Sequence, residues 1–438
     1  MNLISKFKAS NKKLFDNSIA FFSSFFLQFT LQIIFPPLMI MIWGASNFGI
    51  ILFLIAVPGS LAFLIINFNT PQRQEMGKAY VSKDFIGVNK IYTNTVLLLL
   101  INYLVYFLVS LFFLKFIEFE RLNNTINNDE ANLILGLIFI SVLVGFFQNI
   151  FSMKVSYLGI YHIHKYIELL YDSAIKISIL LIGLLSQSFI KLFIIYLILS
   201  LIRSIVYYLY SKKIKDTFFS INKIDTTYFK TILKKSMPYC FSQLEETAKT
   251  SVIILIIGIF FDFKTVAFIT TIRTMFYFFP RKFFEIFPEL LHFEYVKLLG
   301  KKHYAQLRKL YIGQNLLMFS LAIIYLLISY FFGSIIYDFW TKNEFIYDTK
   351  ILHLLILDGF FFLLSSSLIS FLKSINKFFS FSVFTIVSQI TLIIIIYFSY
   401  LNGQNYEILF LTSFVLSFLI FFISIFYFKH SLNLMQSK

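Results

Sequence analysis

Long apolar runs, separated by short polar and basic stretches, follow one another from residue 17 to residue 428. A helix that crosses about 30 Å of hydrocarbon needs about 20 residues, so runs of this length predict transmembrane helices. Twelve spans are expected, at 17–42, 49–70, 91–114, 132–153, 166–186, 189–210, 237–260, 265–291, 309–333, 351–372, 377–401 and 406–428. The pattern therefore predicts an all-α integral membrane protein with about twelve transmembrane helices.

The composition supports this class, since 58% of the residues are hydrophobic and only 14% are charged, against about 25% charged in soluble domains. The single cysteine, Cys240, excludes an internal disulfide and a cysteine metal cluster. The net charge of +16 is spread over the connections between apolar runs, so it indicates membrane topology, and no nucleic-acid partner is expected.

Most of the 38 lysines and arginines lie in alternate connections. The basic connections are the N-terminus, 71–90, 152–165, 211–235, 294–309, 373–377 and 429–438. Positive residues favour the cytoplasmic side, and an even number of spans returns the chain to the side on which it began. Both termini are therefore expected in the cytoplasm.

The seventh span contains an unusual polar stretch, SQLEETAKTS at 242–251, followed by nine apolar residues. Nine residues give only about 14 Å of helix, so a helix starting near Met237 and Pro238 is expected, with the polar stretch inside the bilayer. Glu245 and Lys249 are four residues apart and can pair. A charge at the centre of a span costs at least about 2.5–3.5 kcal/mol, so it normally faces a partner or a hydrated cavity. An internal Glu–Lys pair without a substrate role is the alternative.

The fifth span has a similar stripe, because Glu168, Asp172 and Lys176 are spaced by four residues. Lys176 is expected at about the depth of Lys249. Glu168 and Asp172 have the alternative of lying at the cytoplasmic interface.

Further polar residues interrupt other spans: Gln28 and Gln32 in the first, Gln243 and Glu246 on one face of the seventh, Arg273 in the eighth, Asp358 in the tenth and Gln389 in the eleventh. For the glutamines of the first and eleventh spans, hydrogen bonding between helices is the alternative to a ligand role. Asp358 is either a protonatable carboxylate or the partner of a neighbouring helix.

The two halves of the chain resemble each other. The segment SNFGIILFLIA follows the first span and FDFKTVAFITT follows the seventh, and Lys90-Ile91-Tyr92 matches Lys309-Leu310-Tyr311. Six spans per half indicate a parallel repeat about an axis normal to the membrane. The expected organisation is an N-terminal six-helix lobe (1–210), a cytoplasmic linker (211–235) and a C-terminal six-helix lobe (236–438), related by a pseudo-two-fold around a V-shaped central cleft.

Three features carry a family resemblance: the short turn WGASNFGI at 43–50, the helix exit at Pro288 followed by Gly300, and the inner loop 152–166. With the twelve-span layout, the chain resembles the multidrug/oligosaccharidyl-lipid/polysaccharide exporter (MOP) superfamily, and within it the Wzx-type polysaccharide flippases. The resemblance implies a flippase of the bacterial inner membrane that moves undecaprenyl-diphosphate-linked oligosaccharides from the inner to the outer leaflet for O-antigen or capsule synthesis. It implies as partners membrane lipids, a polysaccharide polymerase and a chain-length regulator.

The candidate residues fit that cargo in three groups. Cations for the diphosphate are Lys176, Lys249 and Arg273; amides for the sugars are Gln28, Gln32, Gln243 and Gln389; carboxylates for coupling to a proton or sodium gradient are Glu246 and Asp358. No catalytic residue, metal or cofactor is expected.

Two other functions remain open. A cation-coupled multidrug antiporter of the same superfamily would favour a cleft dominated by carboxylates. A polytopic glycan polymerase or glycosyltransferase would need catalytic groups outside, but the longest outer loops, 115–131 and 334–350, contain no histidine and no recognised paired motif. The sequence has no G-x-x-x-x-G-K-[ST] motif, so ATP is not expected to drive it directly.

Overall fold

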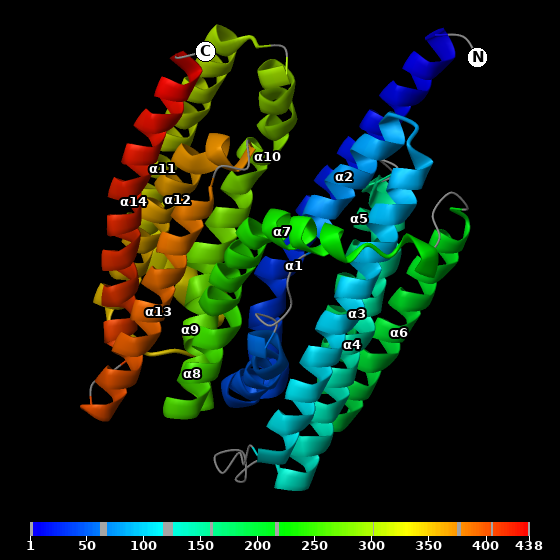
Figure 1. Cartoon of the computed structure of the whole chain (residues 1–438). Helices are drawn as coiled ribbons and strands as arrows, with labels where there is room; N and C mark the ends of the chain where they lie inside the picture. Colours follow the sequence, from blue (N-terminus) through cyan, green and yellow to red (C-terminus); the bar gives the residue numbers. More distant parts are fainter. Residues whose placement is uncertain are drawn as a thin grey trace. The chain divides into compact units, whose positions relative to one another are not determined.

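The computed structural model describes residues 3–61, 68–116, 126–157, 161–214, 219–300, 302–374, 378–403 and 406–436. These residues are almost entirely helical and include no strand (Figure 1). The predicted all-α class is confirmed. The helices are α1 (Leu3–Ser60), α2 (Asn69–Val81), α3 (Phe85–Phe116), α4 (Asn128–Tyr157), α5 (Tyr161–Leu185), α6 (Phe189–Lys212), η3 (Ile221–Lys223), α7 (Thr226–Thr247), η4 (Ala248–Val252), α8 (Ile253–Phe260), α9 (Phe263–Arg273), η5 (Thr274–Phe278), α10 (Phe279–Gly300), α11 (Tyr304–Thr341), α12 (Thr349–Ser374), α13 (Phe379–Leu401) and α14 (Glu407–Gln436).

Eight helices among the described residues are long and apolar enough to cross a membrane. They are Ser23–Ser60, Phe85–Leu114, Asp129–Val155, Phe189–Lys212, Tyr304–Thr341, Thr349–Leu372, Phe379–Leu401 and Glu407–Asn433. The first of them covers most of the first predicted span and residues 49–60 of the second, whose residues 62–67 lie outside the described part of the chain. The fifth, seventh and eighth predicted spans are helical as well, but they carry charged residues or change helix type along their length. The chain is a multi-pass membrane protein.

The predicted turn between the first two spans is a kink inside α1. Gly44 adopts φ 76° and ψ 158°, a conformation that glycine reaches without the steric cost of a Cβ atom. A Cβ at Gly49 would overlap the backbone of Phe263 at the start of α9. The two glycines therefore let the chain change direction and pack closely at the short turn that the sequence predicts.

Two helix ends differ from the expectation. The helix of the seventh span was expected to start near Met237, but α7 begins at Thr226 because Asp225 caps it, accepting from the amides of Thr227 and Tyr228. The expected helix exit at Pro288 is wrong too, since α10 continues to Gly300. The extra turns of α10 are held by burial of Tyr295 and Leu298 against α11 and α12.

The chain divides into two compact units, 1–44 with 50–255 and 45–49 with 256–438. The first unit includes α7 and η4, which the expected boundaries divide between the linker and the C-terminal lobe. α7 packs against α2 and α3, and the Lys235 ammonium lies 2.9 Å from the Glu75 carboxylate of α2. The expected boundaries at 210 and 235 stay a prediction.

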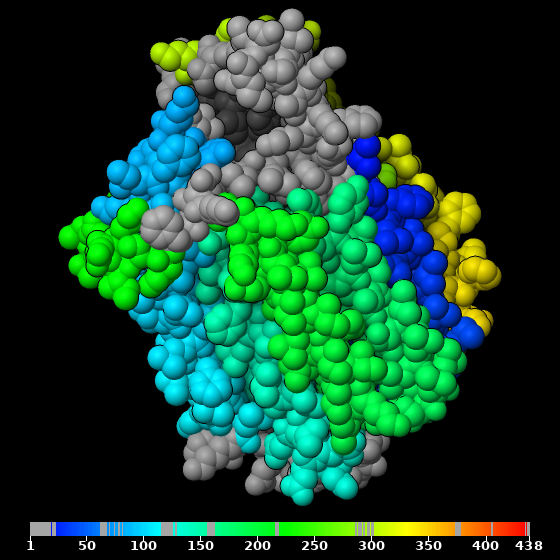
Figure 2. Space-filling view, turned by 90° about the vertical axis from the view of Figure 1, so that its right-hand side faces the viewer, coloured from blue at the N-terminus to red at the C-terminus, as the bar shows by residue number. Residues whose placement is uncertain are grey.

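In the first unit, α6 packs against α4 and α5, and α3 against α4. Figure 2 shows the face of this unit that α4, α5 and α6 share. The segment before α7 is tied to α3. The Asn94 amide donates to the Lys223 carbonyl at 3.0 Å and accepts from the Asp225 amide at 2.8 Å, and Lys90 lies 2.6 Å from Asp225. The hydrogen bond from Lys90 and that from Thr227 hold the pKa of the Asp225 carboxyl below its usual range.

In the second unit, α12 packs against α10, α11 and α14. The cores along it are mostly aromatic and aliphatic, and one of them contains Tyr295, Tyr311 and Phe371. A second core contains Phe284, Met318 and Leu363. α12 is therefore a central helix of this unit, and its Asp358 is 2% exposed.

Candidate functional site

The polar stretch of the seventh span contains a buried ion pair. Lys249, in the π-helical turn η4, is 5% exposed, and its Nζ lies 2.6 Å from Oε1 of Glu245. The predicted pairing is confirmed. The turn is closely packed, since a Cβ at Gly59 would lie 2.6 Å from the Ser251 hydroxyl. Lys249 is thus enclosed by helices, and its charge is balanced by a neighbour one turn away.

The other two candidates of this stretch are less enclosed. Gln243 is half-buried and Glu246 is exposed. The Glu246 carbonyl accepts from the Thr250 hydroxyl at 2.8 Å. Glu246 is therefore the most exposed of the three polar candidates of this stretch, Gln243, Glu246 and Lys249.

The stripes of the first and fifth spans lie against each other. Nε2 of Gln28 donates to Oδ2 of Asp172 at 3.3 Å, which joins α1 to α5. One turn further along α5, the Lys176 ammonium lies 5.9 Å from the centroid of the Phe35 ring of α1. Gln32 is half-buried on α1. The structure therefore brings two candidates, Gln28 and Lys176, and the stripe residue Asp172 to one helix–helix contact.

One charged group in the first unit is missing from the candidates that the sequence indicates. Arg203 of α6 lies 3.2 Å from Glu168 of α5, and its guanidinium stacks 3.6 Å from the centroid of the Tyr171 ring. The Tyr207 hydroxyl donates to Glu168 at 2.9 Å and lies 2.5 Å from Nδ1 of His164. The sequence carries one signal for this group: an arginine inside an apolar span needs a partner, and Glu168 is the first acid of the preceding span.

In the second unit, Arg273 ends α9 immediately before the π-helical turn η5. It is 8% exposed, and its guanidinium lies 5.1 Å and 5.9 Å from the ring centroids of Phe278 and Tyr277. π-helical turns are rare and are frequently found at functional sites. The buried cation Arg273 therefore lies directly beside a π-helical turn.

Asp358 of α12 accepts hydrogen bonds from two hydroxyls of α14, Ser413 at 2.5 Å and Ser417. The residue that follows it, Gly359, packs directly on η5, since a Cβ there would lie 2.6 Å from the Phe276 carbonyl. The same carbonyl accepts from the Tyr325 hydroxyl at 2.5 Å. Asp358 thus pairs with a neighbouring helix, α14, which is one of the two roles that the sequence predicts for it.

Gln389, the candidate of the eleventh span, lies on α13 with two other buried polar residues, Ser382 and Thr385. Ser382, Thr385 and Gln389 are 3%, 1% and 7% exposed. The Thr385 hydroxyl donates to the Ser382 carbonyl at 2.9 Å. These three residues are therefore enclosed on one face of α13.

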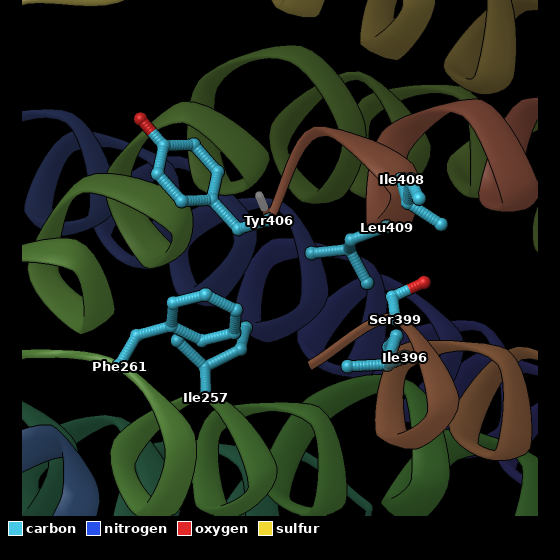
Figure 3. Close-up of a pocket in the computed structure, with 7 residues that line it drawn as sticks. All are labelled: Ile257, Phe261, Ile396, Ser399, Tyr406, Ile408 and Leu409. Atoms are coloured by element: carbon cyan, nitrogen blue, oxygen red, sulfur yellow. The ribbon is translucent and has the colours of Figure 1, made fainter. Parts of the chain in front are cut away.

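Two cavities have defined linings. The first, of about 10 Å³, lies in the second unit (Figure 3), where Ile257 and Phe261 face Ile396 and Ser399 of α13 and Leu409 of α14. It is close to the 10–15 Å³ that one water needs, which is too small for a sugar. The second, of about 240 Å³, is a groove between α5 and α6. Among the described residues, no group of three or more His, Cys, Asp or Glu side chains is placed to hold a metal ion.

The all-helical architecture, its two compact units and its membrane-spanning helices define the class of fold: it is the fold of the MATE transporters of the MOP superfamily. The chain is similar to a multidrug resistance MATE family transporter of the MOP superfamily in its inward-facing conformation, with 11% identity over 95% of this chain and 96% of that one, at a TM-score of 0.59. It is similar to the Vibrio cholerae MATE transporter VcmN in the bent form, with 13% identity over 96% and 98% of the two chains, at a TM-score of 0.59.

A third similar structure is a MOP superfamily transporter from Pyrococcus furiosus, with 12% identity over 97% and 96% of the two chains, at a TM-score of 0.53. No protein-family model and no curated protein matches the sequence. At these identities the similarity establishes the fold, and it agrees with the predicted two-lobed arrangement of about twelve helices.

Proposed function

We propose that the protein is an alternating-access flippase that moves undecaprenyl-diphosphate-linked oligosaccharides from the inner to the outer leaflet of the bacterial inner membrane, with both termini in the cytoplasm. The observation that carries the proposal is the set of enclosed cations on its helices. Lys249 and Arg273 are 5% and 8% exposed, and Lys176 and Arg203 are partly buried. An anionic head group cannot enter hydrocarbon unaided, and cations at depth lower that barrier.

The surroundings of these cations assign them different roles. Lys176 and Arg273 lie over aromatic rings, contacts worth about 0.5–2 kcal/mol. Charge-assisted hydrogen bonds to phosphate are stronger, at about 1.5–3 kcal/mol each, so phosphate contacts to these two cations outweigh the ring contacts. Lys249 forms an ion pair with Glu245 at 2.6 Å. We assign phosphate contacts to Lys176 within the first unit and to Arg273 within the second.

The remaining candidates fit sugar recognition and coupling to an ion gradient. Gln28, Gln32, Gln243 and Gln389 supply amide donors and acceptors for sugar hydroxyls. Asp358 and Glu246 are the proposed coupling carboxylates. A protonated Asp358 can keep both serine contacts, whereas an ionised one accepts from them, so binding of a proton there changes the charge beside η5 without breaking the helix contact.

The rival within this fold is a multidrug antiporter, since the 11% identical neighbour is a multidrug resistance transporter. For the Pyrococcus furiosus transporter, a reversed polarity of the binding pocket suggests a different function. For that transporter, the polarity of the binding pocket is thus linked to its function. The cations of this chain favour an anionic cargo.

The test is translocation in proteoliposomes of a lipid-linked oligosaccharide with a diphosphate head. We expect Lys176→Ala and Arg273→Gln each to lower the rate at least tenfold at equal protein level. Lys302→Ala, at an exposed position, is the matched control and should not change it. Parent-like rates in both cleft variants would overturn the proposal.

A further inference from the structure

The groove between α5 and α6 is lined by one face of each helix. Its lining comes from one stripe of each helix, at positions 167, 170, 171 and 174 of α5 and 199, 202, 203 and 206 of α6. Both sets follow the i, i+3, i+4, i+7 spacing of a single helix face. The two faces meet around Ala174, whose small side chain leaves the space open. The result is a groove of about 240 Å³, the volume of about eight water molecules at ~30 Å³ each.

The groove opens to the side of the helix pair. Leu170 and Ile202 on its rim are 71% and 51% exposed, whereas Tyr171 beneath them is buried. α6 is long and apolar enough to span a membrane, so the medium outside this opening is hydrocarbon. An empty apolar groove loses dispersion contacts on one side, and an apolar chain from that medium restores them.

The base of the groove is polar at one point. Arg203 stacks on Tyr171 and uses one terminal nitrogen for Glu168. Its Nε is buried and has no hydrogen-bond partner among the described residues. A buried donor of a charged group without an acceptor is rare in native structures. The groove therefore offers an apolar wall together with a cationic donor that still needs an acceptor.

The depth of Arg203 restricts what can supply that acceptor. Nine residues, about 14 Å of helix, separate it from Lys212 at the end of α6. A phospholipid whose head group stays at the level of Lys212 places only hydrocarbon at Arg203. A lipid whose anionic head group crosses the membrane brings phosphate oxygens there.

We infer that the α5–α6 groove is a binding site for a polyprenyl diphosphate, with the isoprenoid chain between Leu170 and Ile202 and the phosphate end at Arg203. This inference rests on the proposed function and adds to it a place for the isoprenoid chain on the first unit, with Arg203 as a phosphate contact besides Lys176 and Arg273. Glu168 holds Arg203 in the groove while the chain is absent, and a diphosphate supplies the acceptor for Nε when it arrives.

The experiment is photolabelling of the protein in nanodiscs with two diazirine probes of equal chain length, a prenyl diphosphate and a phosphatidylglycerol. Labelled positions are mapped by peptide mass spectrometry. We expect the prenyl diphosphate to label 167–174 and 199–206 at least tenfold more than the phosphatidylglycerol. Equal labelling by both probes, or no label in these segments, would overturn the inference.

Two variants test the contact with the isoprenoid chain and the contact with the phosphate separately. Ala174→Phe fills the groove and should reduce prenyl diphosphate labelling about tenfold, whereas Leu184→Phe, at a position of α5 that is 67% exposed, should not. The double variant Glu168→Gln/Arg203→Gln removes both charges together and should reduce labelling by the diphosphate but not by the matching prenol. Unchanged labelling in Ala174→Phe, with its fold verified by thermal stability, would contradict a binding site in this groove.

The outcomes also separate this site from the proposed function. Groove labelling by the prenyl diphosphate without translocation of lipid-linked oligosaccharide supports the site and rejects the flippase. Translocation without groove labelling supports the flippase and rejects the site.

Discussion

Replacing Lys249 by methionine removes the cation from a buried pair and leaves the Glu245 carboxylate without its ammonium partner at 2.6 Å. Breaking a buried pair in this way costs about 3–5 kcal/mol. The Glu245 side chain is 19% exposed, so water can partly compensate it, and we expect the lower end, about 3 kcal/mol. The double variant Glu245→Gln/Lys249→Met leaves no uncompensated charge and should recover most of that loss.

The assay is a double-mutant cycle, with the free energy of unfolding measured in mixed micelles for the parent, both single variants and the double variant. The two residues are in contact, so their effects should be strongly non-additive. Additive losses, or a double variant no more stable than Lys249→Met, would show that the pair does not form in the folded protein.

The same variants separate structure from transport. Because the charge of Lys249 is balanced by Glu245, the double variant should retain more translocation than Arg273→Gln. A double variant that is as stable as the parent but fails to translocate would assign Lys249 a direct contact with the cargo.

Three further predictions address other parts of the chain. Both amide atoms of Gln72 in α2 are buried with no hydrogen-bond partner among the described residues, so Gln72→Met should raise the free energy of unfolding by about 1–3 kcal/mol; a loss would indicate ordered water at that position. The lowered pKa of Asp225 means that its cap stabilises α7 above the unfolded value of about 3.9 and that this stabilisation is lost as pH falls below it. In Lys90→Met the pKa of Asp225 should be lowered less, so the cap should be lost at a higher pH as the solution is acidified. Proteolysis at 219–225, measured along a pH series, reports this loss. A profile with the same pH dependence as that of the parent would contradict the role of Lys90. Asp358→Asn preserves an acceptor for Ser413 but cannot ionise, so gradient-driven transport should fall at least tenfold while exchange without a gradient continues; unchanged gradient dependence would exclude Asp358 from coupling.

The arrangement of spans could be predicted because hydrophobic run length reports directly on the membrane. The sequence was less informative where tertiary contacts determine the backbone. α7 begins at Thr226 because Asp225 caps it, eleven residues before the apolar run indicated. The π-helical turns η4 and η5 depend on packing against neighbouring helices, such as that of Gly359 on Phe276, and no residue spacing indicates them.

Among the candidate residues, contacts within one helix could be predicted, whereas contacts between helices could not. Pairs within one helix, such as Glu245–Lys249, follow from spacing alone and were predicted. The Arg203–Glu168 pair joins two helices and depends on their relative rotation, which a hydrophobicity pattern does not fix. Likewise, the contact between Gln28 and Asp172 needed two stripes on separate helices to face each other.

The central claim, that the cargo is an anionic lipid-linked oligosaccharide, is tested most directly by one transport measurement. Purified protein in proteoliposomes is offered a fluorescent polyprenyl-diphosphate oligosaccharide and, separately, a cationic drug. We predict translocation of the oligosaccharide lipid well above that of empty liposomes, and its loss in Arg273→Gln, with no gradient-driven drug transport. Drug transport without movement of the lipid-linked oligosaccharide would contradict the claim.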